Sequence, residues 1–506
     1  MAHFLGIDIG TTSTKAIVCS LLGEVRSVAS RGYPMSNPAP DRVEQDPQAI
    51  FRAVVQATRE AIGKAQLLPQ EIRAIGFSAA MHSLIAVDAQ GRPLTQCWIW
   101  ADRRSFPQAE RLRHTEAGMA LYHRTGTPLH PLSPLCKLLW MRENDPELFQ
   151  KADRFISIKE YVMYHWCGRF VVDESIASAT GIFNLHERTW DAEALAWVGL
   201  QPDRFSSLVP TTHVLQGMRS DLAKEMGLHP DTPLVVGASD GVLANLGVGV
   251  LSTDHLVATI GTSGAIRQTV PVPSTDPEGR SFCYVLTQDL WVVGGATHNG
   301  GVIWQWFVER LMAEEGKGLE GYDRWLERAA TVPPGAEGLL FLPLLAGERA
   351  PYWNPDARGV FLGLGLHHGP SHLARSVLEG IVFNLYGIAT LLPLGDGTQT
   401  VRVSGGLAQA ALWRQLMADL FNREVAVPEV REASGLGATM LAMVAVGALQ
   451  DLTQATAFVK LKNFHQPRSP VTRHYRELFK LYQRVYHQLE GEFAELQKIG
   501  PFHETG

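Results

Sequence analysis

The sequence is poor in cysteine, and its cysteines lie far apart. Five of them are spread over 506 residues, and no two form a Cys-x-x-Cys pair. This pattern argues against a disulfide framework and predicts reduced thiols, as in a cytoplasmic protein. The five are Cys19, Cys97, Cys136, Cys167 and Cys283.

Long hydrophobic runs and a strong excess of one charge are also missing. No run of about 20 uncharged apolar residues occurs, so no membrane span is expected. The N-terminus lacks a basic region and Asp8 interrupts its first apolar run, so no signal peptide is expected either. With a net charge of −6, nucleic acid and anionic membranes are not expected partners.

The composition is that of an ordinary globular protein. Hydrophobic residues make up 45% of the chain and charged residues 19%. At 506 residues the chain is long enough for two or three domains with sizeable cores. We predict an N-terminal domain over 1–248, a C-terminal domain over 249–450 and a helical extension over 451–506.

Two short turns of similar composition occur, one in each half of the chain. In Phe4–Val18 and His255–Gln268, an apolar run leads into Ile-Gly-Thr, small residues and a second apolar run. Each stretch predicts a β-hairpin with its turn at Gly10–Ser13 or Gly261–Gly264, since glycine allows the backbone of a tight turn. Backbone N–H groups and hydroxyls in such turns can hold phosphate oxygens. Two ordinary hairpins are the alternative.

The repeated turn favours a duplicated fold that binds a nucleotide between its halves. Asp8, two residues before Gly10, is suited to hold a magnesium ion through its water shell. Strands and helices alternate after the first hairpin, which argues for an α/β domain around a central sheet. Within this pattern, Asp46-Pro47 predicts a helix start and Ile72–Phe77 a buried strand.

A second aspartate follows a core strand. The buried strand Leu234–Val236 leads into Asp240 and a helix rich in glycine and alanine. An aspartate in this position lies at the mouth of the sheet, where α/β proteins bind ligands. Its alternative role is to cap the following helix. The second Ile-Gly-Thr turn, a short way further along the chain, favours the functional role.

Aromatic and charged residues gather in the stretch Trp98–Ser105. Trp100, Asp102 and Arg103 suit a polyhydroxylated ligand, because aromatic walls and convergent charged groups bind such molecules well. A partly buried helix start capped by Asp102 fits the same residues equally well. Lys137 stands in a Lys-x-x-Trp spacing, and its own pattern predicts a solvated position on a helix.

The last third of the chain carries a glycine pair and a long amphipathic segment. Gly405-Gly406 follows a predicted strand, and such a pair lets the backbone approach a nucleotide. A helix rich in glycine and alanine is predicted over Ser434–Leu449. Apolar residues recur at helical spacing from Tyr475 to Leu496, which predicts a helix packed on the body of the protein. A homodimer formed through this helix is the alternative.

The two turns resemble the phosphate loops of the ATPase fold shared by actin, hexokinase and the heat-shock chaperones. From about Phe4 to about Val446 the chain resembles the FGGY carbohydrate kinases, and above all their gluconate kinase branch. Pro134–Trp140 resembles the first signature of this family, although Leu132 departs from its leading position. Gly359–Glu379 matches the second signature closely.

This resemblance implies an α/β fold of two ribonuclease H-like domains with a nucleotide cleft between them, and ATP and Mg²⁺ as cofactors. It makes Asp240 the general base and Asp8 the residue that helps to place magnesium. Ala410 stands where some relatives have an asparagine that contacts adenine. The other implied phosphate and nucleotide contacts are Thr11, Thr12, Ser13, Gly261, Thr262, Gly301, Gln305, Gly405 and Gly406.

On the acceptor side, Met81 and His82 match the Met-His pair of the family. Ser83 follows them, as in gluconate kinases, whereas xylulose kinases usually have glycine there. By itself, His82 is more typical of a partly buried histidine with satisfied hydrogen bonds. Further acceptor contacts are expected from Trp100, Asp102, Arg103 and Asp240, and an arginine suits a carboxylate.

The predicted reaction is ATP-dependent phosphorylation of a primary hydroxyl of a sugar acid, converting D-gluconate to 6-phosphogluconate. The runner-up is the same chemistry on a ketose such as xylulose or ribulose. A different class, the actin-like ATPases that drive motion or assembly, shares the fold. A chaperone needs a peptide-binding domain, for which the residues after Gly447 are too few, and a filament protein has little use for Trp100–Arg103 and Asp240.

Overall fold

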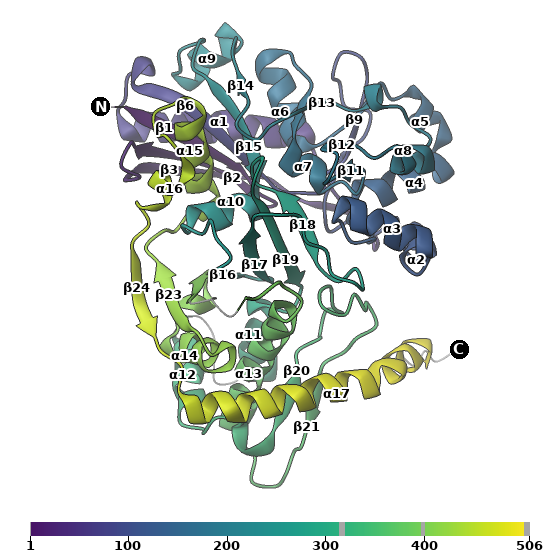
Figure 1. Cartoon of the computed structure of the whole chain (residues 1–506), viewed down its shortest axis with the longest axis vertical. Helices are drawn as coiled ribbons and strands as arrows, with labels where there is room; N and C mark the ends of the chain where they lie inside the picture. The colour runs from purple at the N-terminus through teal and green to yellow at the C-terminus, as the bar shows by residue number, and fades with distance from the viewer. Residues whose placement is uncertain (1, 313–318, 396–399, 500–506) are drawn as a thin grey trace. The chain divides into compact units, whose positions relative to one another are not determined.

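The structure is a computed structural model that describes residues 2–312, 319–395 and 400–499. These residues pack as two compact units, each built from several segments of the chain (Figure 1). Unit 1 comprises Met1–Ser252, Thr269–Val293 and Val430–Lys460, and unit 2 comprises Thr253–Gln268, Gly294–Glu429 and Leu461–Gly506.

Unit 1 is built on a six-stranded sheet with strand order β14-β15-β6-β1-β2-β3. β1 pairs antiparallel with β2, whereas β6 runs parallel to both β1 and β15. Because parallel strands end at the same edge of a sheet, the residues that follow β1, β6 and β15 lie together. The strands are β1 (His3–Ile9), β2 (Ser13–Ser20), β3 (Val25–Gly32), β6 (Ile72–Ala79), β14 (Val214–Leu215) and β15 (Leu234–Ser239).

Helix α1 (Pro47–Ala65) packs on this sheet and begins where the sequence predicts a helix start. Asp46 occupies the N-cap and accepts a hydrogen bond from Gln48 N, while Pro47 takes the first helical position. The apolar face of the helix, which includes Ile50, contributes to one core with the inner faces of β1 and β6. The sheet and α1 are therefore fixed against each other by buried side chains.

Shorter elements complete unit 1. Small sheets join β5 to β4 and β8, β7 to β9, β10 to β13, and β11 to β12. These strands, with β18, are β4 (Ser36–Ala39), β5 (Arg42–Gln45), β7 (Ile85–Val87), β8 (Cys97–Trp98), β9 (Arg154–Ile156), β10 (Val171–Asp173), β11 (Phe183–Asn184), β12 (Thr189–Trp190), β13 (Ser207–Val209) and β18 (Phe282–Val285). The helices are α2 (Phe106–Arg113), α3 (Glu116–Thr125), α4 (Pro134–Asn144), α5 (Pro146–Lys151), α6 (Ile158–Cys167), α7 (Glu174–Ser178), α8 (Ala192–Val198), α9 (Ser220–Met226), α10 (Asp240–Gly247), α15 (Ala433–Ala445) and α16 (Leu452–Thr456).

The units differ from the domains predicted from the sequence in several segments. The first crossing between units follows Ser252, near the predicted boundary at 248. Residues 269–293 and 430–450, however, pack in unit 1 rather than with the predicted C-terminal domain, and the predicted extension is divided between the units after Lys460. The backbone of α15 lies directly on β1, because a Cβ added at Gly6 would stand 2.2 Å from the Gly435 carbonyl oxygen. The glycines that predict close packing of this helix are thus used against the sheet of unit 1.

Unit 2 repeats the strand order of unit 1. The sheet that contains β16 runs β18-β19-β17-β16-β22-β23-β24, and the strands from β19 to β23 correspond in order to β3-β2-β1-β6-β15. β16 pairs antiparallel with β17 and parallel with β22, as β1 does with β2 and β6. The predicted duplication of an α/β fold is confirmed. The strands of unit 2 are β16 (His255–Ile260), β17 (Gly264–Val270), β19 (Trp291–Thr297), β20 (Leu340–Leu342), β21 (Val360–Leu362), β22 (Thr400–Ser404), β23 (Glu424–Pro428) and β24 (Leu461–His465).

The helices of unit 2 include the long C-terminal helix predicted from apolar spacing. Helix α17 packs along α14 (Figure 1), and its buried face includes Tyr475, Phe479 and Tyr482. This face is buried in unit 2, as predicted for a helix packed on the body, and a homodimer through the rest of the helix stays a prediction. The helices are α11 (Gly301–Trp306), α12 (Leu319–Ala330), α13 (Pro370–Ala389), α14 (Ala411–Phe421) and α17 (Ser469–Ile499).

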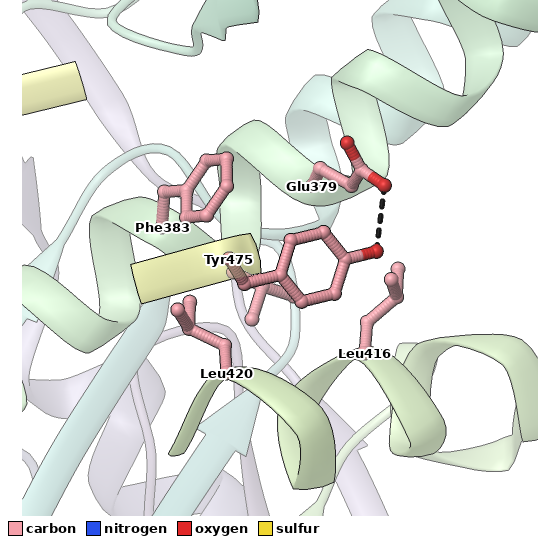
Figure 2. Close-up of a pocket in the computed structure, with 6 residues that line it drawn as sticks. Glu379, Phe383, Leu416, Leu420 and Tyr475 are labelled. Atoms are coloured by element: carbon pink, nitrogen blue, oxygen red, sulfur yellow. Dashed lines mark hydrogen bonds between the residues drawn. The ribbon is translucent and has the colours of Figure 1, made fainter. Parts of the chain in front are cut away.

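A buried polar cluster anchors α17 to α13 (Figure 2). The Tyr475 hydroxyl donates to Glu379 Oε1 (2.7 Å), and the ring lies among apolar side chains that include Leu416 and Leu420 of α14. Arg375 forms an ion pair with Glu379 (2.6 Å) and donates to the Tyr475 hydroxyl (2.7 Å). Glu379 belongs to the second family signature, so this part of the signature serves packing.

Two predictions from composition, on membrane-spanning helices and on cysteines, can be compared with the described residues. No helix among them is both long and apolar enough to cross a membrane. All five cysteines fall within them and are free thiols, of which only Cys167 is partly exposed. Burial raises the pKa of both Cys97 and Cys283 to about 12, so these thiols stay protonated near neutral pH.

Candidate active site

Three strands of unit 1 bring predicted site residues to one edge of the sheet. Asp8 on β1 lies beside Ser78 on β6, and Ser78 lies beside Ala238 on β15. The turn after β1, the segment Ala80–His82 after β6 and Asp240 after β15 therefore share the carboxyl-terminal edge. This edge is where α/β proteins bind ligands.

Hydrogen bonds within the turn and from Tyr33 hold the turn between β1 and β2. Gly10 N donates to Ser13 O (3.1 Å), and the strands pair from Ile9 onwards, as the sequence predicts. The Tyr33 hydroxyl donates to Gly10 O. Thr12 is exposed at the tip, and its carbonyl accepts a hydrogen bond from Tyr33 N (3.2 Å). The backbone of the turn is therefore held in one conformation.

Thr11 connects this turn to the predicted acceptor residues. Trp100 Nε1 donates to Thr11 Oγ1 (2.8 Å), and Gln45 Nε2 donates to Thr11 O (2.7 Å). Trp100 comes from the aromatic stretch after β8, far from the turn in sequence. A candidate phosphate residue and a candidate acceptor residue are thus in direct contact.

Asp8 is a carboxylate with one close hydrogen-bond donor and charged groups nearby. Ser78 Oγ donates to Asp8 Oδ1 (2.7 Å), while Lys15, its cross-strand neighbour, pairs with Glu432 (2.7 Å). Burial raises the pKa of Asp8 above its ordinary value, and the Ser78 hydrogen bond and the Lys15 charge act against this rise. A cation bound nearby would favour the charged form, so Asp8 fits the predicted magnesium role.

No cluster of three or more His, Cys, Asp or Glu side chains that could hold a metal occurs among residues 2–312, 319–395 and 400–499. Mg²⁺ usually keeps several of its waters and is bound through one or two carboxylates plus substrate phosphates. A single carboxylate such as Asp8 therefore suffices for this ion, and a dense ligand cluster is not required.

Asp240 begins α10 at the carboxyl end of β15. Ser239 takes the N-cap position, and Asp240 Oδ1 accepts a hydrogen bond from Gly241 N (2.6 Å). The Asp240 carbonyl accepts a hydrogen bond from Ser434 Oγ (3.1 Å). Ser239 therefore takes the capping position that the alternative gives to Asp240, whereas Asp240 is the first residue of the helix and lies at the sheet edge that the functional alternative requires.

A buried ion pair lies behind Asp240. Lys159 and Asp173 are almost fully buried and approach to 2.6 Å, and Lys159 Nζ also donates to Ala238 O (3.1 Å). Burial lowers the pKa of Lys159, while the charges of Asp173 and Asp240 oppose this change. The end of β15 is therefore tied to α6 by a lysine whose charge acts on the predicted base.

The Met-His pair follows β6 in a turn of unusual backbone. His82 has a φ of 66°, and Met81 beside it is half-buried. His82 Nδ1 lies 2.7 Å from Ala179 O, and its ring meets Tyr284 edge to face. His82 is therefore a partly buried histidine held at both ring nitrogens, as its own pattern predicts, since the Tyr284 hydroxyl lies 3.5 Å from Nε2.

The aromatic stretch after β8 contains an unpredicted ion pair. Asp102 is buried and binds the Arg104 guanidinium through both carboxylate oxygens (2.8 Å each). Arg104 also pairs with Glu44 and stacks 3.8 Å above the Trp98 ring. Asp102 therefore organises this segment, and Arg103, the other predicted acceptor residue, is exposed.

In unit 2 the corresponding turn interlocks with the start of α11. Gly301 N donates to Gly261 O (2.8 Å), and Val302 N donates to Thr262 O (3.0 Å). A Cβ added at Gly301 would stand 2.5 Å from the Gly261 oxygen, so only glycine allows this approach. Gly261, Thr262 and Gly301, predicted from separate parts of the chain, are in direct backbone contact.

The glycine pair after β22 reaches the same edge. Gly405 has a φ of 98°, and a Cβ there would stand 2.1 Å from the Ile260 carbonyl oxygen. A Cβ at Gly406 would meet nothing within 4 Å. Gln305 is exposed on α11, where it donates to Glu309, and its place in a nucleotide site stays a prediction.

Both halves of the chain match domains of a known protein family. Residues 3–247 match the N-terminal domain, and residues 256–446 the C-terminal domain, of the FGGY family of carbohydrate kinases. The chain belongs to this family. The predicted resemblance is thereby confirmed over most of the chain.

Curated relatives within the FGGY family cover nearly the whole chain. The gluconokinases of Bacillus licheniformis and Bacillus subtilis are each 43% identical to it over 502 residues, which is 98% of this chain and 98% of each relative. The xylulose kinase of Bacillus subtilis is 29% identical over 489 residues, or 96% of this chain and 97% of the relative.

Solved FGGY structures have the same fold. The gluconate kinase from Lactobacillus acidophilus superposes with a TM-score of 0.93 at 33% identity, covering 98% of this chain and 99% of its own. A xylulose kinase from the same organism gives 0.94 at 33% identity, covering 98% and 100%. The fold is thus common to a gluconate kinase and a xylulose kinase.

Sequence reasoning alone missed Lys137 of the first FGGY signature. Its own pattern predicts a solvated lysine, which is wrong, because the side chain is fully buried. Lys137 Nζ donates to the carbonyls of His82 (2.6 Å), Ile99 (2.8 Å) and Trp98 (3.3 Å). The signal was present in the Lys-x-x-Trp spacing, although spacing does not reveal which carbonyls a lysine meets.

Ser83, which the sequence resemblance relates to gluconate kinases, is also buried. Its hydroxyl oxygen accepts a hydrogen bond from Ile158 N (3.0 Å) at the start of α6. The contact satisfies a helix N–H that has no partner within the helix. In this structure Ser83 supports the neighbouring helix.

Proposed function

We propose that this FGGY kinase transfers the γ-phosphoryl group of ATP to the primary hydroxyl of D-gluconate, giving 6-phosphogluconate. One observation carries the choice of acceptor. Identity to the Bacillus gluconokinases is 43%, whereas identity to the xylulose kinase of Bacillus subtilis is 29%, at similar coverage. Each identity is an average over nearly the whole chain and therefore does not depend on one motif.

In this proposal Asp240 is the general base. A hydroxyl is a poor nucleophile until its proton has an acceptor, and a carboxylate within hydrogen-bond reach provides one. Asp240 stands at the sheet edge, with its backbone fixed by α10 and by Ser434. The nearby charge of Lys159 favours the ionised carboxylate, which is the form that accepts the proton.

The phosphate groups are proposed to lie against the two turns. Thr11, Thr12 and Ser13 would face the transferred phosphoryl group, while Gly261 and Thr262 would hold the nucleotide phosphates. Phosphoryl transfer depends chiefly on positioning and charge neutralisation. Mg²⁺ held near Asp8 would offset the phosphate charge, and Asp8 has the oxygen chemistry that this ion prefers.

The acceptor would lie between the Met81-His82 turn and Trp100. Both segments reach the edge at which Asp240 stands, and Trp100 is joined to Thr11 of the phosphate turn. Arg103, exposed beside them, is the proposed partner of the gluconate carboxylate. The Asp102–Arg104 pair would support this segment and leave direct recognition to its neighbours.

A ketose kinase is the second candidate. The xylulose kinase from Lactobacillus acidophilus covers the chain as completely as the gluconate kinase from that organism, at the same 33% identity. In a ketose kinase Asp240 would keep its role, and only the group that meets the acceptor's far end would differ.

The test is ADP release by the purified protein with D-gluconate, D-xylulose, D-ribulose and glycerol, at saturating ATP and Mg²⁺. We expect kcat/KM for gluconate to exceed that for every other acceptor by at least about tenfold, equivalent to ~1.4 kcal/mol of transition-state binding. A larger kcat/KM for a ketose would overturn the acceptor assignment. ADP release that no acceptor stimulates would overturn the kinase assignment itself.

A further inference from the structure

One buried ammonium group joins two chain segments that sequence places far apart. Lys137 lies on α4 and is fully buried. Its Nζ donates to His82 O (2.6 Å) in the turn after β6, and to Ile99 O (2.8 Å) and Trp98 O (3.3 Å) at the end of β8. An ammonium group has three N–H donors, and each finds a carbonyl here.

Two of these carbonyls belong to residues that form, or directly precede, a proposed acceptor contact. His82 itself is one of them, and Ile99 is directly followed by Trp100. The turn at His82 has a φ of 66°, which non-glycine residues seldom adopt. A backbone in this region persists when surrounding contacts hold it in place. The charge-assisted hydrogen bond from Lys137 is one such contact.

A second residue of α4 acts on the same stretch. Trp140, three residues after Lys137, meets Trp98 edge to face with ring centroids 5.6 Å apart. The Arg104 guanidinium lies 5.3 Å from the Trp140 ring. The lysine and the tryptophan of the Lys-x-x-Trp spacing therefore both fix the segment after β8, one through its backbone and one through its side chains.

Packing alone does not explain a lysine at this place. A buried charge costs free energy unless it is fully hydrogen-bonded, and an apolar side chain of the same length would fill the space without that cost. The apolar replacement would leave the carbonyls of His82 and Ile99 without this donor. A lysine is therefore advantageous here if the exact course of the two segments matters more than stability.

We propose that Lys137 is a positioning residue that sets the spacing between the Met81-His82 turn and Trp100, and with it the fit of the sugar acceptor. The inference rests on the proposed acceptor site and goes beyond it, because Lys137 acts through the two backbones and not on the acceptor directly. The carbonyls that Lys137 meets all belong to unit 1, whereas the proposed phosphate contacts Gly261 and Thr262 belong to unit 2, so ATP binding should be insensitive to Lys137.

The experiment compares Lys137→Met with Lys137→Arg and with Leu138→Ala. Methionine has a similar length and lacks the donors, arginine keeps a cation with several donors, and Leu138 is a fully buried neighbour on α4. For each variant, kcat, the acceptor KM and the ATP KM are measured with the acceptor that the wild type uses best. Melting temperature reports the effect on folding. Using the best acceptor keeps this test independent of whether that acceptor is gluconate.

We expect Lys137→Met to raise the acceptor KM by at least about tenfold. A hydrogen bond from a charged group contributes enough free energy to change a binding constant by this factor or more. Its ATP KM should stay within about twofold of the wild type, and Lys137→Arg should recover most of the acceptor affinity. Leu138→Ala should lower the melting temperature without a selective change in acceptor KM, because its effect is a cavity.

Several outcomes would overturn the inference. An unchanged acceptor KM in folded Lys137→Met would do so, as would equal increases in both KM values. If neither Lys137 variant folds while Leu138→Ala does, Lys137 serves folding and the positioning role is wrong. A wild type that uses gluconate best, together with an unaffected Lys137→Met, would contradict this inference and leave the proposed function intact. A wild type that phosphorylates no acceptor would contradict both.

Discussion

The two Gly-Thr turns have the same position in their sheets and are held in different ways. In unit 1, side chains make most of the contacts to the turn: Gln45 and Trp100 reach Thr11 and the Tyr33 hydroxyl reaches Gly10 O, beside one backbone hydrogen bond from Tyr33 N to Thr12 O. In unit 2, backbone braces it, because Gly301 N and Val302 N donate to the carbonyls of Gly261 and Thr262. The two sheets share their topology, so the difference comes from the segments that each unit packs against its turn.

The proposed function gives the two turns of the duplicated fold different uses. A turn connected to Trp100 and lying at the edge shared with Asp240 can respond to the acceptor, whose shape varies among relatives. A turn built from glycines packed on backbone leaves little room for side chains, which suits phosphate groups common to every nucleotide. We therefore expect substitutions around the first turn to affect acceptor use, and those around the second to affect ATP.

The largest effect is expected at Asp240, on the side of unit 1. Asp240→Asn should lower kcat by roughly 10²–10⁴-fold, because the amide cannot accept the proton of the attacking hydroxyl. The amide oxygen can still accept the hydrogen bond from Gly241 N, so melting temperature and ATP affinity should stay near wild type. Steady-state kinetics and thermal melting measure these quantities.

Two results at Asp240 would change the account. A variant that keeps more than about a tenth of the wild-type kcat, outside the range for loss of a general base, would remove Asp240 from the chemistry. A variant that is inactive and strongly destabilised would show that the contact with the helix start is its main role.

In unit 2 the glycine pair after β22 offers the matching test. Gly405→Ala places a methyl group 2.1 Å from Ile260 O at a φ of 98°, so it should destabilise the unit by ~1–3 kcal/mol and raise the ATP KM. At Gly406 a methyl group meets no protein atom within 4 Å. Gly406→Ala should therefore change the melting temperature little. It should raise the ATP KM by roughly tenfold, because the methyl group would take space proposed for the nucleotide. A normal ATP KM in both variants would separate the pair from the nucleotide.

A smaller effect is expected from pH acting on Lys137. Burial lowers its pKa to about 7, with Asp102 and Cys97 acting to raise it and Arg104 acting to lower it. Below pH 7 the ammonium donates to all three carbonyls, and above it the amine has one donor fewer. Burial raises the pKa of Cys97 to about 12 and of Cys136 to about 11, so neither thiol titrates between pH 7 and 9.

The acceptor KM should consequently rise by a few-fold from pH 7 to pH 9, by roughly the worth of one hydrogen bond. Lys137→Arg keeps its charge over this range and should show a flatter profile. Parallel profiles for the two proteins would mean that Lys137 does not titrate there. The ATP KM, measured in the same series, reports any change that comes from unit 2.

The smallest effect is expected at Ser83. Ser83→Gly removes the acceptor of the hydrogen bond from Ile158 N, at a cost of about 1 kcal/mol in stability. Because the hydroxyl supports α6, the preference for gluconate over xylulose should change by less than about threefold, or ~0.6 kcal/mol. A tenfold shift towards xylulose would instead mean that Ser83 acts directly on the acceptor.

Local patterns in the sequence predicted much of this fold. The proline after Asp46 marks the start of α1, the Ile-Gly-Thr turns close two hairpins, and the apolar spacing from Tyr475 onwards forms α17. Each of these depends on neighbours within a few residues, where backbone sterics and periodic burial dominate. The position of Asp240 at the sheet edge was also predicted, because a residue that follows a core strand lies at the end of that strand.

Contacts between distant segments were not predictable in the same way. Lys137 fits the pattern of a solvated helix residue until its helix is placed against His82 and Ile99. The pairing of Asp102 with Arg104 is local in sequence, yet its burial depends on Trp98 and Trp140 stacking around the guanidinium. The packing of 430–460 in unit 1 likewise depends on where a glycine-rich helix finds a surface.

The most direct test of the central claim is a crystal structure with gluconate and a non-hydrolysable ATP analogue. The account predicts the primary hydroxyl oxygen of gluconate within hydrogen-bond reach, about 3 Å, of the Asp240 carboxylate. It also predicts the sugar acid beside Trp100 and the nucleotide phosphates against Gly261 and Thr262. A primary hydroxyl that meets another side chain, with Asp240 turned to the helix start alone, would contradict it.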